Sequence, residues 1–300
     1  MSLHLAVSPL PGALGLPPEP TSSSSGSFVS IRGRQLAFAD LLSPDLSSPA
    51  YVQQLAEQMR EAKPFPHLVI DGLFSPQLLR LIAEEFDDCR EQDWRVVKSQ
   101  QELTHRSTPG ARLGPAAKLY FSLVNSPYFL DLLSTVSGVE DLITDPKLYG
   151  GGLHETRNGG RFGIHRDFNR HPRTGLDNEM VLITYLNEQW NPEWGGALEL
   201  WDAEGKQCVR SIPPDFGRTV LMRHSDISYH GHPHPLQAPE GRTRRSVACY
   251  YYSYRLARRE RERRNTSLFL FNETVHNFKT AAKLATPPII WQALKRLTGH

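Results

Sequence analysis

The stretch RFGIHRD at residues 161–167 belongs to a series of short apolar runs, between residues 147 and 254, that decide the fold. Turn-forming residues separate several of these runs, as at Asn158-Gly159-Gly160 and Ala203-Glu204-Gly205. Short strands at this spacing are typical of an all-β sandwich or barrel. The predicted strands are Lys147–His154, Arg161–Asp167, Met180–Asn187, Ala197–Trp201, Gln207–Ile212, Arg218–Arg223 and Arg244–Ser253.

A mainly helical support region is predicted ahead of these strands, over residues 31–146. Residues 51–59 carry apolar side chains at the spacing of one helix face. Ser75-Pro76 and Ser126-Pro127 each place a capping residue before a proline that suits the first helical position. Residues 66–71 read as a single strand within this region.

The two ends of the chain differ from this middle part. Residues 1–30 are rich in proline and serine and lack an apolar period, which predicts a disordered leader. Residues 255–300 begin with an arginine-dense run and end in an apolar stripe, which predicts a solvated basic segment followed by a helix. The predicted fold class is therefore α+β, mainly β with flanking helices, with its β domain at residues 147–254.

Charge and composition exclude several classes of protein. Lys and Arg number 34 against 32 Asp and Glu, and a net charge of +2 gives no overall field for nucleic acid or anionic lipid. The longest apolar runs are strand-sized, too short to span a bilayer. Three scattered cysteines argue against a disulfide framework and for a reducing compartment. We therefore expect a cytoplasmic protein with no nucleic-acid partner and no membrane span; the residues do not indicate an oligomeric state.

A metal site is indicated by His165-Arg166-Asp167, because residues i and i+2 of a strand point to the same face. Two histidines and one carboxylate on one side of a metal leave positions for a bidentate co-substrate and for dioxygen, as in non-haem Fe(II) oxygenases. A second triplet of this kind, His224-Ser225-Asp226, has only His276 and His300 as partners beyond the nearby cluster that ends at His234, so the first triplet is favoured. Candidates for its third ligand follow the strand at residues 218–223: His224, His230, His232 and His234.

Residues 147–254 resemble the double-stranded β-helix of Fe(II)- and 2-oxoglutarate-dependent dioxygenases, specifically their prolyl 4-hydroxylase-like branch. The resemblance covers about a third of the chain, and its motifs occur in family order. It implies a jelly-roll or cupin-like core supported by N-terminal helices. The matching motifs are His165-Arg166-Asp167, TYLN at 184–187, WGGALEL at 194–200, PPDFGR at 213–218, YHGHP at 229–233 and GRTRRS at 241–246.

The resemblance makes His165, Asp167 and His230 the iron ligands. His232 is the alternative third ligand, because the His-Gly-His spacing leaves the strand register open. Arg244 matches the residue that pairs with the distal carboxylate of 2-oxoglutarate, and a planar guanidinium suits a carboxylate.

Two more residues match positions that contact the co-substrate in this family. Tyr185 matches a position whose hydroxyl helps to bind 2-oxoglutarate, although a buried strand tyrosine explains it equally well. His154 lies one position away from another contacting residue. Residues 233–241 form a proline-rich insertion between the last histidine and the arginine, and we expect this loop near the mouth of the site.

The chemistry that the resemblance implies uses Fe(II), 2-oxoglutarate and O2, with ascorbate as a candidate reductant. Decarboxylation of 2-oxoglutarate to succinate and CO2 would be coupled to hydroxylation of a C–H bond in a prolyl peptide, another peptide or a small molecule. Two alternatives are a metal-dependent hydrolase on a cupin-like barrel and a non-catalytic module that senses 2-oxoglutarate or a metal. Arg244 favours the oxygenase, because hydrolysis needs no buried clamp for a dicarboxylate.

Overall fold

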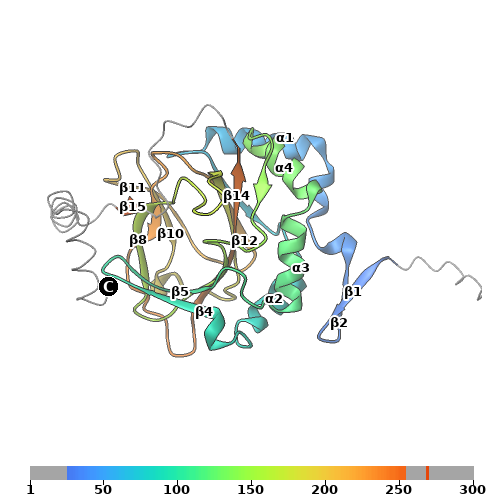
Figure 1. The fold of residues 1–300 in the computed structure, drawn as a ribbon, viewed down its shortest axis with the longest axis horizontal. Coiled ribbons are helices and arrows are strands. Elements are labelled where there is room, and N and C mark those ends of the chain that lie inside the picture. Colours follow the sequence, from blue (N-terminus) through green and yellow to red (C-terminus); the bar gives the residue numbers. More distant parts are fainter. Residues whose placement is uncertain (1–25, 255–267, 270–300) are drawn as a thin grey trace, which may run out of the picture.

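Four helices lie together on one side of a curled β-sheet in the computed structural model, which describes residues 26–254 and 268–269 (Figure 1). Most of the predicted leader and the predicted C-terminal segment lie outside the described residues. Strand β1 begins at Phe28, so it overlaps the last residues assigned to the leader.

The helices are α1 (Pro49–Glu61), α2 (Pro76–Glu85), α3 (Pro115–Val124) and α4 (Pro127–Ser137). Each begins with a proline, and Ser48 and Ser126 cap α1 and α4 with their side chains. The helices predicted at residues 51–59, after Ser75 and after Ser126 are confirmed, whereas the sequence analysis does not predict α3. None of the described helices has the length and apolar character that a membrane crossing requires. Short 3-10 helices are η1 (Phe38–Asp40), η2 (Pro44–Ser47), η3 (Glu91–Asp93) and η4 (Pro192–Trp194).

The described strands form one large sheet and a separate hairpin of β1 (Phe28–Ile31) and β2 (Arg34–Ala37). Neighbours in the large sheet follow the order β11-β10-β13-β8-β5-β7-β14-β9-β12-β3, while β4, β6 and β15 pair with β5, β14 and β8. Its strands are β3 (His67–Asp71), β4 (Trp94–Lys98), β5 (Glu102–Ser107), β6 (Ile143–Thr144), β7 (Gly152–Thr156), β8 (Arg161–Arg166), β9 (Asp177–Tyr185), β10 (Leu198–Trp201), β11 (Cys208–Ile212), β12 (Arg218–Arg223), β13 (His230–His232), β14 (Arg244–Ser253) and β15 (Leu268–Phe269).

The large sheet curls until strands that are distant in its order share one core. Val181 and Tyr185 of β9 belong to the same buried cluster as Leu198 and Leu200 of β10. Strands β8, β10 and β11 accordingly lie opposite the helices, with β12 and β14 between them (Figure 1). This curled antiparallel architecture is a double-stranded β-helix, so the predicted fold class, mainly β with flanking helices, is confirmed.

The helices cover the outer face of this barrel. Successive residues of a strand point to opposite faces, so Val181 lies in the barrel core while its neighbour Leu182 packs with the helices. Leu79 of α2 and Tyr120 of α3 belong to that second cluster. The Tyr120 hydroxyl also hydrogen-bonds the Thr184 hydroxyl at 2.9 Å, which fixes α3 on β9.

Strands β4 and β5 come from the region that the sequence predicts to be mainly helical. β5 inserts between β7 and β8, with His105 opposite Glu155 and Glu102 opposite Phe162. The side chains that β5 turns into the barrel are polar, so no apolar alternation marks it in the sequence.

Candidate active site

Strands β8 and β13 bring two histidines and an aspartate together inside the barrel. His230 of β13 pairs directly with His165 of β8, and their ring centroids are 4.6 Å apart. Asp167 follows the end of β8, with its Oδ1 3.3 Å from His165 Nε2 and its Oδ2 3.6 Å from His230 Nε2. One ligand atom from each of the three residues lies within 4.8 Å of the others.

Backbone carbonyls fix the orientation of both imidazoles. His165 Nδ1 donates to Gly163 O at 2.8 Å, and His230 Nδ1 donates to Ser228 O at 3.0 Å. Because a carbonyl oxygen only accepts, each Nδ1 carries the hydrogen and each Nε2 presents a lone pair toward Asp167. Burial lowers the pKa of His230 to about 4, which keeps its imidazole neutral. One Nε2 atom from each of two histidines and one carboxylate are the donor set of a facial iron triad, and carbonyl-oriented imidazoles are usual among metal ligands, so these residues fit Fe(II).

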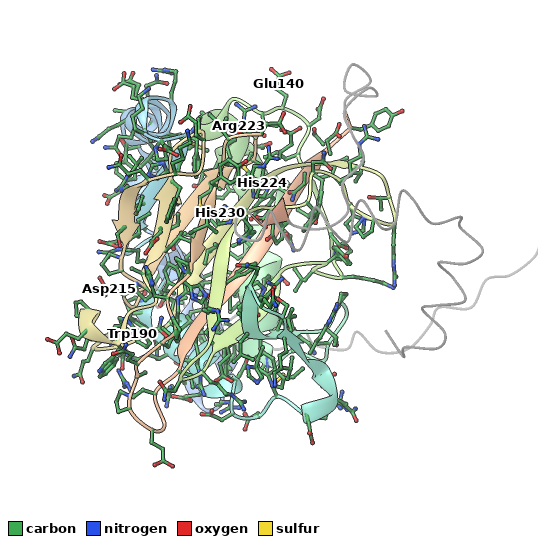
Figure 2. The ribbon with its side chains drawn as sticks, turned by 90° about the vertical axis from the view of Figure 1, so that its left-hand side faces the viewer. Glu140, Trp190, Asp215, Arg223, His224 and His230 are labelled. Atoms are coloured by element: carbon green, nitrogen blue, oxygen red, sulfur yellow. The ribbon has the colours of Figure 1, made fainter. Side chains whose placement is uncertain are left out.

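The carboxylate of Asp167 is held from its other side by two more groups. His224 Nε2 lies 3.1 Å and the Tyr250 hydroxyl 3.2 Å from Asp167 Oδ2. Burial would raise the pKa of Asp167, but the neighbouring His165, His224 and His230 outweigh it and hold that pKa well below the usual range. Figure 2 shows His224 and His230 near each other, away from Trp190 and Asp215. His224 therefore contacts Asp167 of the first triplet. Among the described residues, it does not form a separate metal-ligand cluster with Asp226.

Arg244 is buried on β14 and directed into the same barrel. Its Nε donates to Gly196 O at 2.7 Å, and its Nη2 donates to the Tyr185 hydroxyl at 3.2 Å. Burial lowers the pKa of Arg244 and raises that of Tyr185. Among the described residues, no carboxylate forms a salt bridge with this guanidinium, so it is a desolvated cation suited to an anionic ligand.

The proline-rich insertion at residues 233–241 closes the barrel at the Arg244 end. Leu236 exchanges two backbone hydrogen bonds with the turn between β7 and β8, at Gly159 and Gly160. A Cβ atom on Gly196 would lie 2.6 Å from the Leu236 side chain and 3.0 Å from that of Arg244. Glycine at position 196 thus leaves room for the side chains of both Leu236 and Arg244 beside its backbone.

A single cavity contains all six of the site residues predicted from the sequence. Its walls include His165, Asp167, His230, Arg244, Tyr185 and His154. His154 Nε2 donates to Gly150 O at 3.1 Å, and burial lowers its pKa to about 3. His232 also lines the cavity, but among the described residues the metal-ligand cluster contains His230 and not His232.

Several cavity groups were missed by the sequence analysis. The one signal for Tyr250 is that it lies six residues after Arg244 in the same strand and so shares its face. Thr104 and Arg106 line the cavity from β5, a strand that the sequence does not reveal.

A double-stranded β-helix with a two-histidine, one-carboxylate cluster facing a buried arginine defines the class of non-haem iron oxygenases. A sequence comparison supports the same class, because residues 151–252 match the 2OG-Fe(II) oxygenase superfamily. The predicted resemblance to this superfamily is therefore confirmed over about a third of the chain, and the match indicates an oxidoreductase that uses Fe(II), 2-oxoglutarate and O2. None of the curated proteins compared with the chain matches it significantly.

Solved structures with a similar fold include prolyl hydroxylases. A Pseudomonas putida prolyl-4-hydroxylase is 15% identical, with a TM-score of 0.49, and the alignment covers 68% of this chain and 100% of that one. A Trichoplax adhaerens prolyl hydroxylase, solved with a hypoxia inducible factor peptide, is 15% identical with a TM-score of 0.48, covering 70% and 96%. HygX from Streptomyces hygroscopicus, solved with nickel, 2-oxoglutarate and hygromycin B, is 15% identical with a TM-score of 0.45, covering 62% and 82%.

Proposed function

We propose that this protein is a hydroxylase in which His165, Asp167 and His230 hold Fe(II), and Arg244 with Tyr185 binds the distal carboxylate of 2-oxoglutarate. The observation that carries the proposal is the single cavity lined by both groups. A facial triad leaves positions for a bidentate ligand, and the keto acid end of 2-oxoglutarate is such a ligand. When bound, iron(II) supplies the dioxygen chemistry that couples decarboxylation of 2-oxoglutarate to hydroxylation of a C–H bond.

The side chains around the site orient these ligands and exclude water. The backbone bonds at Nδ1 aim His165 and His230. The three surrounding histidines, His165, His224 and His230, keep Asp167 ionised, and the Tyr250 hydroxyl donates to its Oδ2. Arg244 is held by a carbonyl and a hydroxyl, so its geometry is set before the co-substrate arrives.

The remaining assignments concern the co-substrate and the compartment. His154, neutral with its Nε2–H committed to Gly150, presents Nδ1 as an acceptor, and we place it beside 2-oxoglutarate. The proposed compartment is the cytoplasm, because Cys89, Cys208 and Cys249 are all free thiols.

The proposed substrate is a prolyl peptide, another peptide or a small molecule with an unactivated C–H bond. The Asp167 carboxylate supports hydroxylation over halogenation, since related halogenating enzymes need a small residue at that position.

The test is anaerobic titration of the Fe(II)-loaded protein with 2-oxoglutarate, followed by the visible charge-transfer band and, after air is admitted, by succinate. We expect the band in the wild type and its loss in His165→Ala. Arg244→Gln should weaken 2-oxoglutarate binding about 10- to 100-fold, the loss expected for a buried charged hydrogen bond. Arg242→Gln is the matched control, because Arg242 lies over the Trp194 ring, outside the cavity wall.

Other outcomes separate the alternatives. Iron binding without a charge-transfer band, and equal behaviour of the Arg244 and Arg242 variants, would favour a metal-dependent hydrolase. A sensor module would be favoured if the charge-transfer band forms but no succinate appears, either with a tested substrate or without one. Failure of the wild type to bind any metal would overturn the proposal.

A further inference from the structure

The cavity contains a second arginine whose task the proposed function leaves open. Arg106 lies on β5, outside the segment that matches the superfamily, and lines the wall together with Thr104. It pairs across the sheet with His154, which in turn pairs with Ser246, whereas Arg244 pairs with Thr156. The two arginines therefore occupy different strands and different levels of the barrel.

Arg106 is held in a fixed position beside the metal ligands. Its guanidinium carbon lies 4.7 Å above the centroid of the Phe162 ring. Phe162 in turn stacks on His165, with ring centroids 3.8 Å apart and planes inclined by 28°. This stack of guanidinium, phenyl and imidazole places the positive charge one ring away from a candidate iron ligand.

Glu102 anchors the guanidinium without occupying the cavity. Its Oε1 accepts from Arg106 Nη2 and from the Thr104 hydroxyl, and its side chain is buried. Glu102 is absent from the cavity wall that Arg106 and Thr104 line. A guanidinium has five N–H donors, and the hydrogen bond to Glu102 uses only one of them.

The charge of Arg106 acts on the interior of the cavity. It lowers the pKa of His154, after the larger effect of burial. Its side chain is 22% exposed, whereas Arg244 as a residue is only 7% exposed. Arg106 therefore keeps solvent-exposed surface, whereas Arg244 is almost fully buried.

From this placement we propose that Arg106 recognises a carboxylate on the substrate, so that the preferred substrates are carboxylic acids. The proposal rests on the proposed function, because it assumes that 2-oxoglutarate occupies Arg244 and the metal. Arginine binds carboxylates through two parallel N–H donors, and a stacked, anchored guanidinium loses little freedom on binding.

The experiment uses the full chain, loaded anaerobically with Fe(II) and saturating 2-oxoglutarate, and titrates acetate and benzoate against acetamide and benzamide. Perturbation of the charge-transfer band reports binding without turnover. We expect each acid to bind the wild type at least about tenfold more tightly than its amide, as a charged hydrogen-bond pair requires. Arg106→Gln should abolish this preference and leave the Kd of 2-oxoglutarate within about twofold.

Two variants complete the design. Arg106→Lys keeps a partner for the buried Glu102 carboxylate but loses the planar fork, so it should retain the fold and a weaker preference for acids. Arg161→Gln is the matched control, because Arg161 donates to Gln100 O from β8 and does not line the cavity. It should bind acids as the wild type does.

Three results would overturn the inference. If acids and amides bind equally tightly, or if neither binds, Arg106 does not select a carboxylate. A loss of 2-oxoglutarate affinity in Arg106→Gln as large as in Arg244→Gln would assign Arg106 to the co-substrate. A wild type that binds iron but no 2-oxoglutarate would instead overturn the proposed function on which the inference rests.

Discussion

His224 Nε2 lies 3.1 Å from Asp167 Oδ2, so the residue that follows β12 contacts the carboxylate that follows β8. Both side chains are buried, and Oδ1 of the same carboxylate lies 3.3 Å from His165 Nε2. One oxygen of Asp167 is therefore engaged by His224 and Tyr250 while the other remains beside a candidate metal ligand. Because Oδ2 also lies 3.6 Å from His230 Nε2, His224 and Tyr250 orient the carboxylate that stands between the two histidine ligands.

Loss of His224 should weaken the metal site without removing a ligand. Hydrogen-bond partners of metal ligands typically contribute 10- to 100-fold to metal affinity, so we expect a loss of about that size in His224→Ala. His224→Gln retains an N–H donor and should recover part of the affinity. Competition titration with Fe(II) or Co(II) measures the Kd. His234→Ala is the control, since that side chain is 80% exposed, and equal affinities of the His224 and His234 variants would contradict the prediction.

His230 and His232 should differ sharply when each is replaced by alanine. Only His230 belongs to the ligand cluster, whereas His232 lines the cavity and pairs with Phe162. His230→Ala should therefore lose more than about 100-fold in metal affinity, and His232→Ala less than about threefold. The Co(II) absorption spectrum of each loaded variant gives the measurement. The reverse order of the two effects would make His232 the third ligand.

Local spacing predicts the parts of the site that lie within one strand. His165 and Asp167 were chosen because residues two apart share a face, and the structure places both on the cavity wall. Predicted strand bounds match β12 (Arg218–Arg223) and β14 (Arg244–Ser253) to the residue, because their apolar cores end in charged or turn residues. The choice of His230 as third ligand came from the family resemblance, because local spacing does not show which residues of β13 pair with β8.

Contacts between distant segments could not be predicted in this way. His224 approaches Asp167 only because β12 ends beside the barrel interior, and no sequence period connects the two positions. Arg106 reaches the cavity because β5 inserts between β7 and β8. The inward-facing residues of β5, Thr104 and Arg106, are polar. The strand therefore lacks the alternation of apolar and polar residues by which strands are recognised in a sequence.

Glu85 should stabilise the fold by capping α3. Its carboxylate is buried, and its two oxygens accept from the backbone N–H groups of Ala116 and Ala117 at 2.7 and 2.9 Å. An anion at a helix N-terminus is favourable, and removal leaves buried donors unpaired, so Glu85→Ala should cost about 2–3 kcal/mol. Urea unfolding measures this change. Glu84→Ala is the control, because Glu84 forms only surface ion pairs and should change stability by less than about 1 kcal/mol.

A close approach to the same carboxylate explains the glycine before α3. A Cβ atom on Gly114 would lie 2.2 Å from the carboxyl carbon of Glu85. Gly114→Ala should therefore destabilise the protein about as much as Glu85→Ala, and the double variant should lose less than the sum, because both changes disrupt one contact. Strict additivity in urea unfolding would show that the two residues act independently.

His67 should make the stability of the metal-free protein depend on pH. Its Nδ1 donates to Phe65 O at 2.8 Å, so its Nε2 must accept from Arg210 Nη1 at 2.7 Å. Only the neutral imidazole can do both, and burial, together with the charge of Arg210, lowers the pKa of His67. A lowered pKa in the folded state means that the unfolded chain binds the extra proton below about pH 6.5.

Stability from this contact is therefore complete above about pH 6.5 and is lost as the pH falls, at up to about 1.4 kcal/mol per pH unit. Gln at position 67 does not titrate, so His67→Gln should show a smaller loss of stability between about pH 7.5 and pH 5.5. Urea unfolding of both proteins at the two pH values gives the comparison, with the exposed His234→Gln as the control. If the wild type and His67→Gln lose equal stability, protonation of His67 is not coupled to folding, because every other titrating group is common to the two proteins.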